Sequence, residues 1–316
     1  MTTTWITPVN VSPSATDGWL DVDVSSYIPS SATGVIIDHY DTQVSAGPTH
    51  YRVGLRKNGS TDTLYGRQVG YSHSWAIIGV DASRIFEARL QNSAVQLWLH
   101  GYTESEAIFF TNGIDCEPGS GATWTDKDIS SDTGANTAIA AIVMAGQATA
   151  LDSVPIGIRK NGSTDNRKDQ SGIVCMMSGC DGSEIFETYI STTTNNYTML
   201  CVGYFTAGFT SNTNAIDVSL GSTGSYIDLT ALGTGAIGAC YEVIRTSGAG
   251  YGTKWNIRKD GTSGDEYVNA SWERSLAIIE SSSLICEAKI ETTGVDMFEM
   301  GYFTPFGSTR RAMLVS

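Results

Sequence analysis

One short segment occurs three times in this chain, and that repetition limits the possible folds more than any other feature. Residues 55–62 read LRKNGSTD, residues 158–165 read IRKNGSTD, and residues 257–265 read IRKDGTSGD. Two further landmarks follow each copy in the same order: Ile-Phe-Glu at 85–87 and 185–187 with Ile-Cys-Glu at 285–287, then Gly-Tyr at 101–102, 203–204 and 301–302. A period of about one hundred residues is longer than the roughly 20–50 residues of solenoid repeats and matches a small domain.

The seams between the copies follow similar Phe-Thr stretches, which begin at Phe110 and Phe209. Little sequence separates one copy from the next, so we expect short linkers. We therefore predict three domains, at residues 1–114, 115–216 and 217–316.

Short apolar runs and alternating patterns fill each copy, with clusters of Gly, Ser, Asn and Asp between them. Residues 51–56, for example, read YRVGLR and alternate with a period of two. This pattern is typical of short antiparallel strands joined by turns, and no segment keeps a helical period of 3.6 residues. We predict an all-β chain of three tandem antiparallel β-sandwich domains, with jelly-roll and immunoglobulin-like topologies both open.

The centre of the repeated segment predicts a tight turn. Asn-Gly readily adopts positive φ at both central positions of a type I′ turn, and Asp-Gly does the same. The predicted hairpin turns are Asn58-Gly59, Asn161-Gly162 and Asp260-Gly261. An alternative is that the three Arg-Lys loops together bind one anionic ligand. However, Asn-Gly and Asp-Gly usually occur in turns because the backbone angles of the turn require them.

A glutamate and an arginine recur in every copy. The glutamate stands in an apolar strand, where a carboxylate could serve as a general acid or base. Pairing with arginine is the usual remedy for a carboxylate in apolar surroundings. We predict structural ion pairs in each copy: Arg56 with Glu87, Arg159 with Glu187, and Arg258 with Glu287.

Charge and composition exclude several classes of partner. The formal net charge is −14, with 33 acidic and 19 basic residues, so no nucleic-acid partner is expected, because phosphate binding needs clustered Lys and Arg. No apolar run approaches the roughly 18 residues of a membrane span. The first residues, MTTTWI, have neither a basic region nor an apolar core, so we expect no signal peptide.

No motif for a metal, a cofactor or a catalytic nucleophile is recognisable, and we expect no cofactor and no enzymatic activity. The four histidines lie in the first copy alone, without zinc-ligand spacing: His39, His50, His73 and His100. The six cysteines are too few and too uneven for a disulfide framework. Tryptophans could form a sugar-binding surface, although they are more often buried.

The repeated [Leu/Ile]-Arg-Lys-Asn-Gly-Ser-Thr-Asp segment, followed by Ile-Phe-Glu and Gly-Tyr-Phe-Thr, resembles repeats of virion structural proteins of tailed bacteriophages. The resemblance implies a non-enzymatic component located in the virion: a capsid decoration or cement protein, a head fibre, or a tail accessory protein. It implies capsid or tail proteins as partners, leaves an oligomer possible, and carries over no catalytic residues.

Two other functions stay open. One is a lectin-like module of a fibre, which would bind a surface carbohydrate or a receptor through clustered aromatic and polar side chains. The other is a polysaccharide hydrolase, which needs two carboxylates converging in a groove. The spacing of the acidic residues indicates no such pair.

Overall fold

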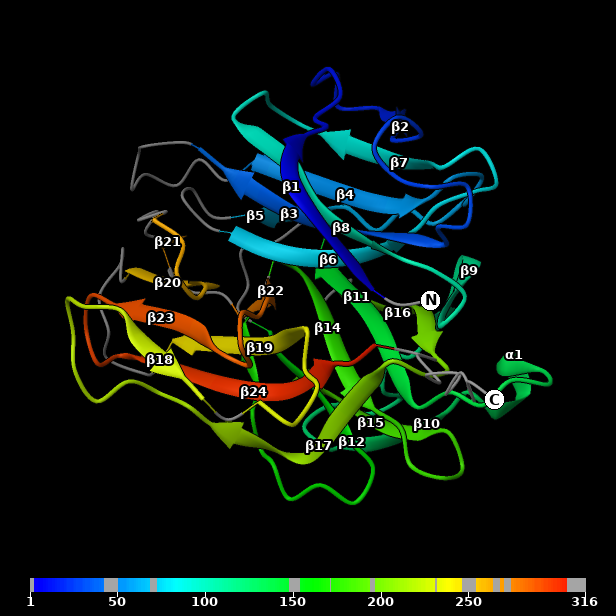
Figure 1. Ribbon diagram of the computed structural model, residues 1–316. Coiled ribbons are helices and arrows are strands. Elements are labelled where there is room, and N and C mark those ends of the chain that lie inside the picture. Colours follow the sequence, from blue (N-terminus) through cyan, green and yellow to red (C-terminus); the bar gives the residue numbers. More distant parts are fainter. Residues whose placement is uncertain are drawn as a thin grey trace, which may run out of the picture.

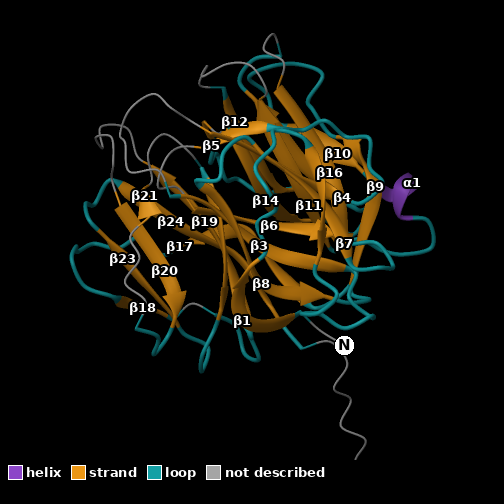
Figure 2. Ribbon diagram, turned by 90° about the horizontal axis from the view of Figure 1, so that it is seen from above, coloured by secondary structure: helices purple, strands orange, loops and turns teal. Residues whose placement is uncertain are grey.

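The structure is a computed structural model, which describes residues 3–42, 51–68, 73–147, 154–170, 172–193, 197–230, 232–245, 254–263, 268–269 and 274–305. The described chain is almost entirely β-structure, arranged as six four-stranded antiparallel sheets (Figures 1 and 2). A single turn of helix, α1 (Ser130–Thr133), lies at the edge of the molecule. None of the described helical residues forms a segment long and apolar enough to cross a membrane.

The sheets come in three pairs along the chain, and each pair is called a unit below. In the first unit, one sheet has the order β1-β8-β3-β6 and the other β2-β7-β4-β5. The strands are β1 (Thr4–Asn10), β2 (Trp19–Asp23), β3 (Gly34–Asp41), β4 (Tyr51–Lys57), β5 (Gly66–Gln68), β6 (His73–Gly79), β7 (Ile85–Leu90) and β8 (Val95–Thr103).

The second unit has the same strand order, with sheets β9-β16-β11-β14 and β10-β15-β12-β13. Its strands are β9 (Ala107–Asp115), β10 (Thr125–Asp128), β11 (Ala140–Gln147), β12 (Pro155–Lys160), β13 (Asp169–Gln170), β14 (Ile173–Gly179), β15 (Ile185–Ile190) and β16 (Tyr197–Phe205).

The third unit repeats this order as β17-β24-β19-β22 and β18-β23-β20-β21. Its strands are β17 (Phe209–Asp217), β18 (Ile227–Leu229), β19 (Gly238–Arg245), β20 (Lys254–Lys259), β21 (Val268–Asn269), β22 (Ser275–Glu280), β23 (Cys286–Ile290) and β24 (Val295–Phe303).

One sheet of each unit borders the centre of the molecule. Strands β6, β14 and β22 contact one another across the units, and Figure 1 shows the three coloured lobes meeting around them. We call the sheets that contain these strands the central sheets, and the other three the peripheral sheets. The predicted domain boundaries at 114/115 and 216/217 fall near the ends of β9 and β17, which belong to the central sheets of the following units.

The prediction of three tandem β-sandwich domains, jelly-roll or immunoglobulin-like, is wrong for the chain as a whole. The six small antiparallel sheets are arranged as a six-bladed β-propeller, and three of them, the central sheets, also contact one another through β6, β14 and β22. The strands within each sheet are not consecutive in the chain, so the sheets are not simple meanders. One apolar cluster includes Ile77, Met177 and Ile278 and so runs through all three units.

The three-sandwich prediction fails because the central strands are covered on both faces, so the units cannot be separate sandwiches. Every residue of β6 and of β14 is buried, whereas a strand of an isolated sandwich would expose one face in alternation. The peripheral strand β7 does alternate, with Phe86, Ala88 and Leu90 buried and the residues between them partly exposed. The unbroken apolar run at 75–78 was the signal for two-sided burial.

Candidate binding faces on the peripheral sheets

The outward face of each peripheral sheet carries one of the predicted ion pairs. Each arginine lies directly opposite its glutamate on the neighbouring strand. The Nε–Oε2 distances are 2.9 Å for Arg56–Glu87, 2.7 Å for Arg159–Glu187 and 2.9 Å for Arg258–Glu287. All three predicted pairs are therefore formed, and in the first two the guanidinium group donates hydrogen bonds to both carboxylate oxygens.

An aromatic ring completes each pair. The guanidinium carbon lies over the ring at 4.1 Å for Arg56 and Trp19, 4.3 Å for Arg159 and Trp124, and 3.4 Å for Arg258 and Tyr226. These are cation–π contacts. Sequence reasoning missed the rings, although each stands two residues before an aspartate in a Trp/Tyr-x-Asp pattern (residues 19–21, 124–126 and 226–228).

These clusters define what we call the aromatic faces, one on each unit. A face consists of the ring, the arginine, the glutamate, and the aspartate opposite that glutamate: Asp21, Asp126 or Asp228. The three aspartates are exposed, and the rings are partly buried. Because each arginine is held by both a carboxylate and a ring, the faces are rigid and polar with an aromatic centre.

The predicted type I′ turns are wrong in detail. Gly59, Gly162 and Gly261 have φ of 79°, 80° and 75°, whereas no positive φ occurs at the residues before them. A single positive φ at the second central position fits a type II turn, with Ser60 N donating to Lys57 O at 3.1 Å. The strands are also not joined by two residues, because β5 begins only at Gly66.

The residues after the turn instead hold the next unit in place. Thr61 N donates to Asn112 Oδ1 at 2.8 Å, and Gly113 N donates to Asp62 Oδ2 at 2.7 Å. The second unit repeats both bonds, with Thr164 N to Asn214 Oδ1 at 2.9 Å and Ala215 N to Asp165 Oδ2 at 2.8 Å. We call these contacts the clasps. They explain why Ser-Thr-Asp recurs so closely in the first two copies.

The Arg and Lys side chains of the repeated segment make hydrogen bonds within the protein. This weakens the alternative in which three Arg-Lys loops bind one anionic ligand. Arg56 also donates to Asp62 O, and Lys57 Nζ donates to Phe109 O at 3.0 Å. Burial lowers the pKa of Lys57, which reflects the partial withdrawal of its amino group from solvent.

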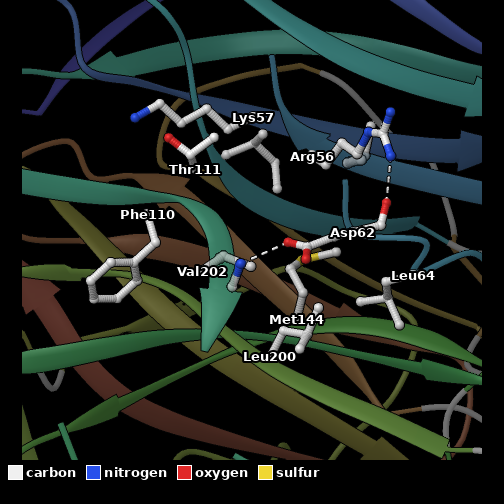
Figure 3. A pocket seen from close by; sticks show the side chains of 13 residues that line it. Arg56, Lys57, Asp62, Leu64, Phe110, Thr111, Met144, Leu200 and Val202 are labelled. Atoms are coloured by element: carbon white, nitrogen blue, oxygen red, sulfur yellow. Dashed lines mark hydrogen bonds between the residues drawn. The ribbon is translucent and has the colours of Figure 1, made fainter. Parts of the chain in front are cut away.

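A cavity lies beside this loop, between the first and second units (Figure 3). Leu64, Met144, Leu200 and Val202 line it. Its volume of about 20 Å³ holds roughly one water molecule and leaves no room for a substrate.

Histidine and aspartate meet at one buried point of the first unit. His73 Nδ1 lies 2.6 Å from Asp38 Oδ2, and His100 Nε2 lies 3.9 Å from the same oxygen. Tyr40 stacks on His73, with ring centroids 3.9 Å apart. His39 is also buried, and His50 lies outside the described residues.

Within the described ranges, one group of carboxylates is close enough to share a cation: Asp228, Asp260 and Glu287, with ligand atoms within 4.8 Å of one another. Arg258 already pairs with Glu287, so part of the negative charge is neutralised. All six cysteines are free and buried. Burial raises the pKa of Cys175 to about 12, which is unsuited to a nucleophile.

Comparisons with known proteins do not identify a family. No family model matches the chain, and no curated protein matches it. A chain from the X-ray structure of the entire lipid-containing bacteriophage PM2 aligns over 96% of this chain and 88% of its own length, at 9% identity and a TM-score of 0.16. A score this low carries no argument about the fold or the function of this chain.

Proposed function

We propose that the protein is a non-enzymatic structural component of a phage particle, a capsid decoration or fibre protein, that contacts other virion proteins through its three aromatic faces. The observation that carries the proposal is the recurrence of one surface cluster on all three units of a single chain. The resemblance of the repeated segments to virion proteins of tailed phages supports the same conclusion.

The composition of the faces suits protein contacts. Trp, Tyr and Arg are the residues most enriched at the energetic centres of interfaces. Their side chains are already fixed by the ion pairs and ring contacts, so little conformational entropy is lost when a partner binds.

Three faces around one centre also suit a repetitive particle surface. A chain of this kind can contact near-equivalent partners around a three-fold lattice point. The faces are not identical, because Tyr226 replaces tryptophan in the third unit. We therefore expect related but unequal contacts.

Rebinding to particles that lack the protein tests this proposal. Triple charge reversal, Asp21→Lys, Asp126→Lys and Asp228→Lys, changes exposed residues that carry no core contact and should reduce saturable co-sedimentation at least tenfold. A second variant, Trp19→Ser, Trp124→Ser and Tyr226→Ser, should do the same. Tyr27→Ser removes an aromatic ring that is 45% exposed outside the faces, and it should rebind like the native protein. Native rebinding by either triple variant contradicts the proposal.

A second candidate is carbohydrate binding, which the partly exposed rings of Trp19 and Trp124 favour. Aromatic rings can pack against the apolar side of a sugar. Retention of the free protein on immobilised cell-surface polysaccharide, with no rebinding to particles, would select this function over the first.

A further inference from the structure

The first unit has a concentration of arginine that the other two lack. Arg52 on β4 lies directly opposite Arg67 on β5. Like charges facing each other across antiparallel strands are destabilising. The equivalent positions pair Pro155 with Gln170 and Lys254 with Asn269, so neither of the other units has this repulsion.

A third arginine stands beside them on the outward face. The guanidinium carbon of Arg89 lies 3.9 Å from the ring centroid of Tyr65, and that of Arg52 lies 5.8 Å from it. Tyr65 is buried at 4% exposure. It therefore forms a floor on which two of the three guanidinium groups rest.

Acidic groups do not balance these charges. Asp17 is the carboxylate at this point, and it already accepts a bond from the Tyr65 hydroxyl and pairs with Arg89 Nε at 3.2 Å. These contacts, the Tyr65 bond first, lower the pKa of Asp17. Among the described residues no ion pair joins Arg52 or Arg67 to a carboxylate, and the neighbouring stretches 43–50 and 69–72 contain no Asp or Glu.

We propose that Arg52, Arg67 and Arg89 form a binding site for an oxyanion, the carboxylate or sulfate group of an acidic ligand. The three arginines and Asp17 leave an excess of two positive charges at this point of a protein of net charge −14, and such a local excess attracts an anion. Arginine is suited to this, because its planar fork binds carboxylate and sulfate-like oxygens through paired hydrogen bonds. The source is either a free inorganic anion or the acidic group of a polysaccharide.

Thermal unfolding with and without anion tests the site. Sodium sulfate and polygalacturonate are the probes, and neutral dextran is the blank. We expect polygalacturonate or sulfate to raise the Tm of the native protein, because a ligand that binds only the folded state stabilises it. The shift should disappear in the double variant Arg52→Gln, Arg67→Gln and remain in Lys254→Gln, which alters the residue of the third unit equivalent to Arg52.

A shift with sulfate assigns the site to a free anion, and a shift with polygalacturonate alone assigns it to a polymer. Without any anion, Arg67→Gln should raise Tm by about 1 °C, because it relieves the repulsion. Equal shifts in the native protein and the double variant, an equal shift with dextran, or no shift with either anion would each overturn the proposal. Particle rebinding is not involved, so failure here is separate from failure of the proposed function.

Discussion

The two seams between neighbouring units have the same backbone and opposite chemistry. At the first seam, the loop before β5 packs against β11, and β5 itself contacts β14. At the second, the equivalent loop contacts Glu242 on β19 and Arg274, the residue before β22. The equivalent side chains are Leu64, Met144 and Ile173 at the first seam and Arg167, Glu242 and Arg274 at the second.

The first seam is apolar. Leu64 lies against Gly146 of the second unit, Gly66 lies against Ile173, and Met144 is 1% exposed. The second seam is a buried ionic network, in which Arg167 Nε lies 2.8 Å from Glu242 Oε2 and Arg274 contacts the other oxygen. Arg274 also donates to Ile156 O at 2.9 Å.

The difference shows that two neighbouring units can pack in this backbone arrangement without charged residues between them. Burying ions costs several kcal/mol per ion, which their attraction repays only with full hydrogen bonding. The ionic seam therefore adds little stability over an apolar one. Its benefit is selectivity, because Arg167 has a suitable partner at Glu242 and none at Met144.

The largest effect is expected when the network is broken by one substitution. Glu242→Met removes the carboxylate that the buried Arg167 and Arg274 share and leaves only Arg167 with another, Asp165, so it should reduce the free energy of unfolding by about 3–5 kcal/mol. The triple variant Arg167→Leu, Glu242→Met, Arg274→Ile copies the first seam and should be neutral or stabilising. Urea unfolding measures both, and a triple variant as unstable as the single one would contradict the equivalence of the seams.

The second-largest loss of stability is expected when a side chain of the apolar seam is truncated. Met144→Ala leaves a cavity between the first and second units, and we expect a loss of about 2–5 kcal/mol in the free energy of unfolding. The same urea experiment checks it. A loss below about 1 kcal/mol would show that the seam does not hold the units together.

Substitutions in the clasps should reduce stability by the same amount at both seams, whereas the buried side chains beneath the clasps differ between the seams. Asn112→Ala and Asn214→Ala each remove the acceptor of Thr61 N or Thr164 N, and each should cost about 1–2 kcal/mol. Thermal unfolding of the two variants should give the same decrease in Tm. A large difference would mean that one clasp is not formed in solution.

The smallest effect concerns a buried carboxylate without an arginine. Glu299 is 1% exposed, its Oε2 has no hydrogen-bond partner, and burial raises its pKa. The folded state therefore favours the protonated acid, and this group destabilises the protein as pH rises through its raised pKa. Glu299→Gln should stabilise the protein by about 1 kcal/mol at pH 7, with a smaller gain at pH 4.5. A gain that grows on acidification would reverse the sign.

Local features were predictable from the sequence, and the packing of the units was not. The period-two pattern at 51–56 predicted β4, and the recurring charges predicted Arg56–Glu87 because both partners are fixed by register. The three-sandwich arrangement failed because an apolar run such as 75–78 does not say what covers its second face. The contacts between units were not predicted because the residues that make them are not repeated. Leu64 and Arg167, for example, stand at equivalent positions and differ in chemistry, so the sequence gives no sign that both have the same role.

The turns show a further limit. Asn58-Gly59 has the composition of a type I′ turn, but Asn58 donates to Asp81 Oδ2 at 2.7 Å and the following residues are used by the clasp. Tertiary contacts thus select the turn type. The rings at Trp19 and Trp124 could have been found from their Trp-x-Asp spacing.

Electron cryomicroscopy of phage particles to which this protein has been rebound tests the proposed function most directly. We predict density of three lobes whose peripheral sheets, at Trp19, Trp124 or Tyr226, touch neighbouring virion proteins. Density attached only through other surfaces, with all three aromatic faces open to solvent, would contradict it.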